Sequence, residues 1–449
     1  MSPTPPAFSP PPRDHVITRS AVVSWMVYDL ANTIFSMGVV SMYFSQYIRA
    51  EVGPKRADAA YGLITAVSMG IIFVISPVLG AMTDRARRRM PFLLWSTIIC
   101  VALTALLGRA SYQVTLLLFV IANAAYQAGL QFYDAMLPEV STEANRGRVS
   151  GIGVAVGYLG SYIAVGLGLY FGSGDIPKLF AWIAATFLLL SIPCFVFVNE
   201  RGNPNPRPVF SWDAVKGSLR ETVATFRNGH QYPGLIRFLV GRIFYTDAIN
   251  TVISIMTLYS MNVAVAKGQG EESAAQTSKL VMMVAITFAI LGGLFWGWLV
   301  DRIGPKRTLN VVLWLWMCTF IGASLMGILS LPMPLFYVIA SAAGIALGGT
   351  WSADRPLMLR LTPPDRVGEF YGLYGMVGRF SAITGPVIWA IVAKITIESG
   401  WMKPAQGQGV GVIVLLFLVL LAYWILRGVS DEKRDWEALR HAQAPPVLR

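Results

Sequence analysis

Two short motifs place an acid, an amide and a hydroxyl on one face of an apolar helix. They are Asp29, Asn32 and Ser36, at positions i, i+3 and i+7, and then Asp247, Asn250 and Ser254 at the same spacing. Ionisable side chains are expensive inside a membrane-spanning helix, so each one is a candidate for function. Such a face can hydrogen-bond a polar solute, and its carboxylate can take an ammonium group or a coupling proton. We therefore predict solute or ion binding at both motifs.

A third polar stripe runs along the apolar segment 112–137. Asn123, Gln127, Gln131 and Asp134 recur at i, i+4, i+8 and i+11, which is again one helical face. Side-chain amides offer donors and acceptors without a charge. We expect Asn123, Gln127 and Gln131 to add neutral hydrogen bonds to the same site.

Two arginines lie inside apolar segments. Arg379 is about eleven residues into its segment, or roughly 16 Å along a helix, which is near the middle of a bilayer. It can hold an anionic group such as a carboxylate, or it can form a structural ion pair with Asp29 or Asp247, and both interpretations stay open. Arg242 is closer to a segment end, where we expect its side chain to extend to the interface.

These side chains need elements that hold them in a membrane. Of the 449 residues, 55% are hydrophobic and only 13% are charged, and the mean hydropathy is +0.57. So much apolar surface requires lipid as a solvent. We expect transmembrane helices near 21–48, 59–82, 90–108, 112–137, 149–171, 177–198, 234–261, 277–300, 308–329, 332–359, 368–395 and 409–426. The sequence therefore predicts an all-α integral membrane protein with twelve transmembrane helices.

One long hydrophilic stretch divides the chain. Residues 200–232 form a linker between two six-helix halves, 21–199 and 233–427, and we expect a helix at the membrane surface near 212–226. Lys and Arg are concentrated in the segments on the side of the two termini, which predicts that both ends are cytoplasmic. We expect residues 1–20 to be a disordered head and 428–449 a tail. With no signal-peptide pattern or disulfide framework, a bacterial inner membrane is the expected location, and an organelle membrane is the alternative.

The two halves match each other at a nearly constant spacing. Asp29 corresponds to Asp247, the element Gly80-x-x-x-Asp84-Arg85 to Gly297-x-x-x-Asp301-Arg302, and Gly147, Gly151 and Gly157 to Gly368, Gly372 and Gly378. Three separate matches indicate an internal repeat. The sequence thus predicts two pseudo-symmetric halves, an arrangement typical of secondary transporters.

The repeated Gly-x-x-x-Asp-Arg elements resemble the loop signature of the major facilitator superfamily. The second copy is the closer one, with Gly297, Asp301, Arg302, Lys306 and Arg307, while the first has Gly80, Asp84, Arg85 and Arg88 but Arg87 where a glycine is usual. An Asp at a helix end can face the N-terminus of an adjacent helix, and Arg can pair with acids or lipid phosphates. We expect these residues to form gating loops that hold one end of the bundle closed; the alternative is charge that only fixes topology.

The resemblance also implies a place for the polar stripes. In this superfamily, helices 1, 4, 7 and 10 line a central cavity, and the three stripes fall on helices 1, 4 and 7. A finer resemblance is to the vacuole-effluxer branch, the autophagy-related amino-acid effluxers and their bacterial relatives. It rests on WMVYDLAN (25–32), LPE (137–139), RGRVSG (146–151), GYLG (157–160), EFYGLY (369–374) and GP (385–386), with Leu30 where a Trp is common. It implies proton-linked or facilitated export of small solutes, with amino acids the attested class.

Two other functions compete with this one. The segment 84–95 is also similar to the glycoside–pentoside–hexuronide cation symporters, which implies a cation-coupled sugar transporter. A non-transporting or lipid-handling membrane protein could use the same fold, but the polar stripes count against an apolar cavity.

Enzymatic and nucleic-acid functions have no support in the sequence. It has no nucleotide-binding loop, metal cluster or nucleophile motif, so we expect no enzyme, cofactor or metal. The net charge of +12 follows the expected topology rather than forming a nucleic-acid patch. We predict a monomer that moves a small polar solute through the bilayer, with a proton as the candidate coupling ion.

Overall fold

The computed structural model describes residues 16–171, 175–209, 212–227, 231–329, 331–430, 432, 434 and 436. The first half contains α1 (Arg19–Phe35), η1 (Ser36–Tyr43), α2 (Phe44–Val52), α3 (Pro54–Arg85), α4 (Met90–Ala105), α5 (Tyr112–Asp134), α6 (Leu137–Val140), α7 (Arg146–Phe171) and α8 (Ile176–Phe197). The second half contains α10 (Leu235–Ala266), α11 (Glu271–Ile303), α12 (Pro305–Leu329), α13 (Met333–Arg360), α14 (Val367–Ala393), η3 (Lys394–Glu398) and α15 (Pro404–Leu426). The amphipathic α9 (Trp212–Arg227) lies between them.

The membrane-spanning helices agree with the predicted ones to within a few residues. Ten helices in the described part of the chain are long and apolar enough to cross a bilayer. The apolar α4, with 16 residues, and α14, with 27, bring the number to twelve. No strand occurs among the described residues. The predicted all-α membrane fold is therefore confirmed.

Turns and breaks follow from local residues. Gly53 has φ of +78°, a conformation that suits glycine, and Pro54 starts α3 directly after it. The first span has one feature that the sequence did not predict, the π-helical segment η1 that begins at Ser36. The wider turn occurs at the end of the Asp29-Asn32-Ser36 face, and π-helical turns are frequent at functional sites.

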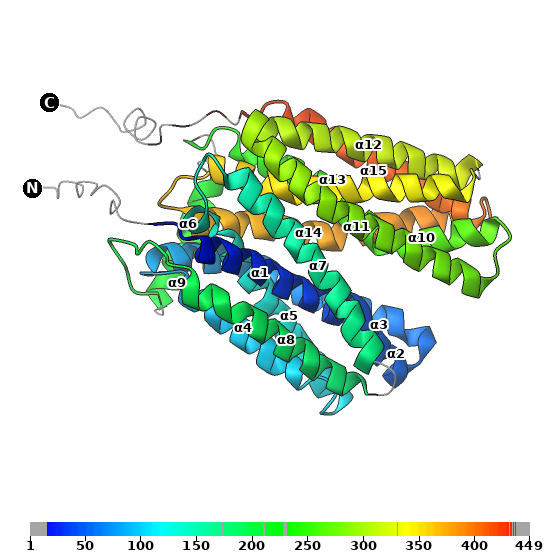
Figure 1. The fold of residues 1–449 in the computed structure, drawn as a ribbon, viewed down its shortest axis with the longest axis horizontal. Coiled ribbons are helices and arrows are strands. Elements are labelled where there is room, and N and C mark those ends of the chain that lie inside the picture. Colours follow the sequence, from blue (N-terminus) through cyan, green and yellow to red (C-terminus); the bar gives the residue numbers. More distant parts are fainter. Residues whose placement is uncertain are drawn as a thin grey trace, which may run out of the picture.

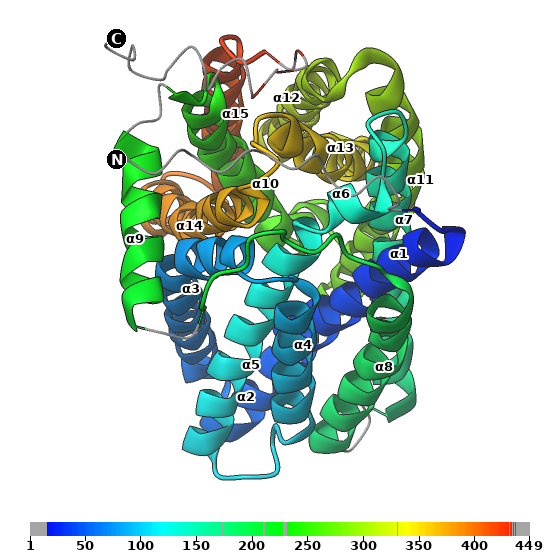
Figure 2. The same cartoon turned by 90° about the vertical axis from the view of Figure 1, so that its left-hand side faces the viewer.

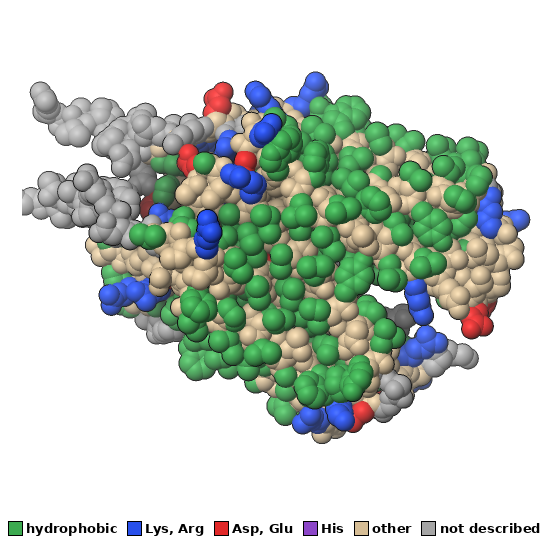
Figure 3. All heavy atoms as spheres, viewed as in Figure 1, with side chains coloured by type: hydrophobic (Ala, Val, Ile, Leu, Met, Phe, Trp, Pro, Cys, Tyr) green, Lys and Arg blue, Asp and Glu red, His purple; other side chains and the backbone are tan. Residues whose placement is uncertain are grey.

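The two halves lie side by side and converge at one end. Figure 1 shows the first half, in blue to green, below the second, in green to red, with the start of α1 and the end of α15 at the same end. We call this the terminal end. Figure 2 looks at it and shows the linker passing across the first half to α9, which runs beside α3. In Figure 3 the broad flank is covered by hydrophobic side chains, charged ones gather toward the two ends, and the surface is hollowed between the halves at the end away from the termini.

Candidate functional site

Glycines let the halves cross closely near the terminal end. A Cβ on Gly151 of α7 would lie 2.3 Å from the carbonyl oxygen of Gly293 in α11, and one on Gly80 of α3 would lie 2.3 Å from that of Gly368 in α14. Side chains at these positions would push the backbones apart, so small residues are needed for the crossing. The two crossings join opposite halves and are related by the internal repeat. In contrast, a Cβ on Gly166, farther along α7, would meet nothing within 4 Å.

The two repeated aspartates cap helices of the opposite half. Asp84, at the end of α3, accepts the N–H groups of Gly368 and Glu369 at 2.7 Å each, in the first turn of α14. Asp301, at the end of α11, accepts the N–H groups of Gly147 and Arg148 at 2.6 and 3.1 Å, in the first turn of α7. The first N–H groups of a helix have no partner within it, and its positive end favours a carboxylate. Each half thus holds a helix of the other half.

The remaining residues of the two predicted gating loops have different surroundings. Asp84 pairs with Arg89 at 2.9 Å, whereas the predicted Arg88 is exposed. Arg148 takes the corresponding place beside Asp301, also at 2.9 Å. The other predicted residues surround these contacts. In the second loop, Gly297 lies at the crossing with α7, Arg302 stacks on Trp298, Lys306 donates to Asn310 and Arg307 is exposed. In the first loop, Arg85 lies against Gly217 of α9. The gating role itself stays a prediction.

An ion bridge lies between the halves, deeper than the caps. Arg355 of α13 is 3.2 Å from an oxygen of Asp29 in α1 and 2.9 Å from an oxygen of Asp134 in α5. All three residues are buried, with exposed fractions of 6 to 8%. The guanidinium belongs to the second half and both carboxylates belong to the first. The bridge therefore ties the halves together by charge.

The preceding residue of α13 serves a second cluster, inside the second half. Asp354 pairs with Arg242 of α10 at 3.0 Å and accepts the hydroxyls of Tyr245 and Tyr374 at 2.5 and 2.9 Å. Arg242 also lies 3.6 Å from the centre of the Tyr374 ring. The prediction that Arg242 extends to the interface is wrong: it is 4% exposed, because a buried carboxylate and an aromatic face compensate its charge.

The middle of the bundle holds polar atoms that lack partners. Arg379 is 5% exposed and donates to the backbone oxygen of Gln127 across the halves, while its Nε has no hydrogen-bond partner in the described part of the chain. The amides of Asn32 and Asn123 are buried, and both their N and O atoms are without partners among the described residues. Buried polar atoms are normally satisfied, so these three side chains are candidates for contact with a solute. Arg379 makes no ion pair with Asp29 or Asp247, which was the structural alternative.

Gln131 and the second-half motif are placed differently. Gln131 hydrogen-bonds Ser76 of α3, both to its hydroxyl and, at 2.9 Å, to its carbonyl, so its amide is already used within the first half. Asp247 is 3% exposed and accepts the hydroxyl of Thr384 at 2.9 Å, and no cation pairs with it in the described residues. Asn250 is half-buried, as is Ser36 of the first motif.

The linker is fastened to the gating loop of the first half. Glu200 accepts the N–H groups of Arg89 and Met90 at 2.6 to 2.9 Å and so caps α4, while Asn203 donates to the backbone oxygen of Asp84 at 2.7 Å. Arg201 pairs with Glu139 at 3.1 Å. The segment that connects the halves therefore also positions the loop that carries Asp84.

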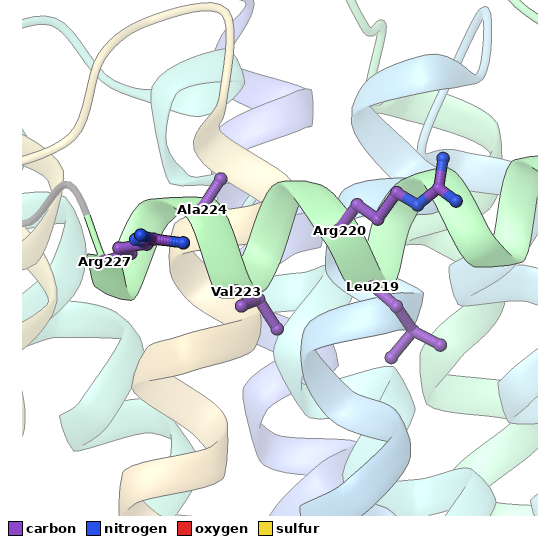
Figure 4. Close-up of a pocket in the computed structure, with 5 residues that line it drawn as sticks. All are labelled: Leu219, Arg220, Val223, Ala224 and Arg227. Atoms are coloured by element: carbon purple, nitrogen blue, oxygen red, sulfur yellow. The ribbon is translucent and has the colours of Figure 1, made fainter.

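The helix that follows in the linker has an apolar side. Figure 4 shows Leu219 and Val223 projecting from the same side of α9 and Arg220 from another, and the two apolar side chains are 47% and 64% exposed. Thr225 of α9 also donates to Glu369 of α14. This pattern suits a helix that lies at a membrane surface.

Asp354 and Arg355 were not among the site residues predicted from the sequence. Both lie near the end of an apolar segment, where charged residues are expected at the membrane surface. The available signal was an adjacent acid and base inside a segment expected to span the membrane, because such residues are functional candidates by default. Only the fold shows that Arg355 meets Asp134, a residue of the helix 4 stripe.

The comparisons with known proteins agree with this architecture. The family model described as Major Facilitator Superfamily matches residues 30–386 and also 248–448. The uncharacterized MFS-type transporter YxiO of Bacillus subtilis (strain 168) is 28% identical over 429 residues, which cover 91% of this chain and 94% of that one. Autophagy-related protein 22 of Coccidioides immitis (strain RS) is 27% identical over 283 residues, covering 57% of this chain and 44% of that protein.

Solved structures share the fold at low sequence identity. The proton:xylose symporter XylE, bound to 6-bromo-6-deoxy-D-glucose, has a TM-score of 0.67 at 14% identity and covers 95% of this chain and 98% of its own. The human organic anion transporter MFSD10 has a TM-score of 0.63 at 17% identity, covering 93% and 100%. The predicted resemblances to the superfamily and its effluxer branch are thus confirmed. The chain belongs to the Major Facilitator Superfamily, a family of membrane transporters rather than enzymes.

Proposed function

We propose that this transporter moves a small polar solute that carries a carboxylate, with amino acids the expected class, and that it exports the solute with proton coupling. Members of its superfamily work by alternating access, so the solute site must lie between the halves. The observation that carries the solute class is Arg379. It is a buried guanidinium between the halves whose Nε has no partner among the described residues, and a guanidinium fork can hold a carboxylate.

Neutral groups around the same helices support a polar solute. Asn32 of α1 and Asn123 of α5 have amides without hydrogen-bond partners among the described residues, and the backbone oxygen of Gln127, one turn beyond Asn123, accepts from Arg379. An amino acid carries hydrogen-bonding groups that such amides can satisfy. A lipid tail cannot satisfy them, which counts against the lipid-handling alternative.

Asp247 is the proposed site of the coupling proton. It is buried against Thr384 and has no cationic partner in the described residues, so a proton is the simplest way to neutralise it. The charge pattern of the loops favours both termini in the cytoplasm, and we propose a bacterial inner membrane and a monomer. In that orientation the closed terminal end is the cytoplasmic one and the hollow faces outward.

Thermal stabilisation of the purified protein by solutes tests the solute class. We expect amino acids to raise the unfolding temperature, and Arg379→Gln to abolish that response while Arg379→Lys retains part of it. Arg109→Gln, at an exposed arginine between α4 and α5, is the matched control and should respond like the wild type. Stabilisation by sugars alone would support the cation-coupled sugar symporter, and stabilisation by lysolipids alone the lipid-handling protein.

Proton coupling needs a transport assay. In proteoliposomes, Asp247→Asn should remove the component of amino-acid flux that is driven by a pH gradient. Unchanged pH-driven flux in this variant would eliminate Asp247 as the proton site.

A further inference from the structure

We propose that the bridge of Arg355 with Asp29 and Asp134 is a second protonation site, which couples the binding of one proton to opening of the bundle at the terminal end. The inference deepens the proposed function, because it assigns residues to the coupling step. It concerns the contact between the halves rather than the solute site. It can therefore be tested without knowing the solute.

The geometry makes the bridge an obligatory contact of the closed state. Arg355 reaches from α13 of the second half to α1 and α5 of the first, at 3.2 and 2.9 Å. Alternating access requires the halves to separate at the end where they are now closed. Since the guanidinium and the carboxylates are on opposite halves, that separation must pull them apart.

The bridge is harder to separate than the ion pair of Arg148 with Asp301, which also joins the two halves. In the pair of Arg148 with Asp301, the arginine side chain is 57% exposed, so water can replace its partner. In the bridge, the side chains of Arg355 and its partners are only 8 to 10% exposed. Parting a buried pair leaves uncompensated charge on both sides and is strongly unfavourable.

The charge count of the bridge points to a proton. Two carboxylates share one guanidinium, so the cluster carries one negative charge in excess when all three groups are ionised. A proton that binds an oxygen of Asp29 or Asp134 removes this excess and weakens the hold on Arg355. The proton belongs to the pair of carboxylates rather than to one of them, because the two groups interact through the same cation.

The neighbouring charges do not supply the missing cation. Arg242 is already paired with Asp354 at 3.0 Å, within the second half. Arg379 faces Asp134 from α14, but its hydrogen bond goes to the backbone of Gln127. The Asp354 carboxylate also faces Asp134, but it is the partner of Arg242 and accepts two tyrosine hydroxyls. Among the described residues, the remaining titratable groups that face the bridge are phenols, from α5, α7 and α14: Tyr126, Tyr133, Tyr158, Tyr371 and Tyr374. Phenols ionise only near pH 10, so between pH 5.5 and 8.5 the carboxylates of the bridge remain the groups that can respond.

Pulsed electron paramagnetic resonance distances test the coupling. One pair of spin labels at the exposed Ala144 and Pro364 reports on the terminal end, and a second at Ala110 and Ser273 reports on the other end, with Cys318→Ser as background. The solute is omitted and the pH is lowered from 8.5 to 5.5. We expect the ratio of open to closed populations at the terminal end to rise by up to about tenfold per pH unit, the limit for one proton taken up on opening.

Variants separate the bridge from other proton sites. The double variant Asp29→Asn, Asp134→Asn should be shifted toward the open state and lose the pH response. Arg355→Gln should lose the response as well, and Arg355→Lys, which keeps the charge and guards against a folding defect, should retain it in weakened form. Glu271→Gln, at an exposed carboxylate in the first turn of α11, is the matched control outside the bridge and should respond to pH like the wild type.

Two results would overturn the inference. One is an unchanged pH response in the double variant, and the other is a pH response that persists unchanged in Arg355→Gln. Failure of amino acids to bind in the thermal assay would refute the proposed solute and leave these distance measurements intact. The two proposals can therefore fail separately.

Discussion

Replacing Gly151 by alanine should shift the transporter away from the closed state seen here. The new Cβ would lie 2.3 Å from the carbonyl oxygen of Gly293 and 2.6 Å from the Cα of Gly297. Both contacts are with backbone, so no side chain can rotate away and α7 and α11 must separate. Overpacking of this kind costs about 1 to 3 kcal/mol. The strain is present in the closed state, where α7 and α11 cross, and is relieved when the halves separate. It therefore corresponds to about a 5- to 150-fold rise in the ratio of open to closed populations.

The same helix provides a matched control. A Cβ on Gly166 would meet nothing within 4 Å, so Gly166→Ala changes the helix propensity of α7 by a similar amount without the clash. Labels at Ala144 and Pro364 should show longer distances at the terminal end in Gly151→Ala and wild-type distances in Gly166→Ala. Gly80→Ala, with Gly70→Ala as its control on α3, should repeat the result at the second crossing. If the clashing and control variants gave the same distance distributions, the close crossings would not determine the conformational equilibrium.

Two further predictions concern the terminal end. Asp84→Asn and Asp301→Asn should each favour the open state by about 1 kcal/mol through loss of a charged helix cap. The effect should be larger for Asp84, because its partner Arg89 is mostly buried while Arg148, the partner of Asp301, is exposed. The distances between the labels at Ala144 and Pro364 measure both effects. Burial raises the pKa of the Glu200 carboxyl above its ordinary value, against the opposing effect of Arg89. The folded protein therefore binds this proton more tightly than the unfolded chain does. The protonated Glu200 contributes its full share to the free energy of unfolding at pH values below the pKa of the unfolded chain, and this contribution is lost as the pH rises through the pKa of the folded protein. For protein purified in detergent, Glu200→Gln should reduce the dependence of the unfolding temperature on pH between the two pKa values. A pH dependence equal to that of the wild type would contradict the assignment to Glu200.

Much of the architecture could be predicted because it depends on local sequence. Hydropathy locates apolar spans without knowledge of their neighbours, and repeated motifs relate the two halves. The expectation that an Asp at a helix end faces an adjacent helix also rests on a short-range rule, that helix N-termini favour carboxylates. The sequence did not show which helix each aspartate would meet, since Asp84 caps α14, almost three hundred positions further along the chain.

The buried charges were harder to predict because their partners come from distant helices. Arg242 and Arg355 both lie near segment ends, where hydropathy cannot distinguish a side chain that reaches water from one that turns inward. The surrounding residues decide between the two: for Arg242, the ion pair with Asp354 and the contact with the Tyr374 ring compensate the desolvation of the buried charge. The unused amides of Asn32 and Asn123 are also invisible in the sequence, since a helical stripe shows which face is polar but not which atoms lack partners.

The internal repeat explains why the bridge can exist at all. Arg355 follows Asp134 at the same spacing that separates Gly368 from Gly147, so the two residues occupy equivalent positions in the two halves. Equivalent residues near a pseudo-two-fold axis approach each other, and two identical carboxylates there would repel. An arginine in one half turns that repulsion into an ion pair across the axis. The caps at Asp84 and Asp301 keep the symmetry and can hold the halves together without distinguishing them. The charge pairing breaks the symmetry, and a single proton on its carboxylate side weakens the attraction between the halves.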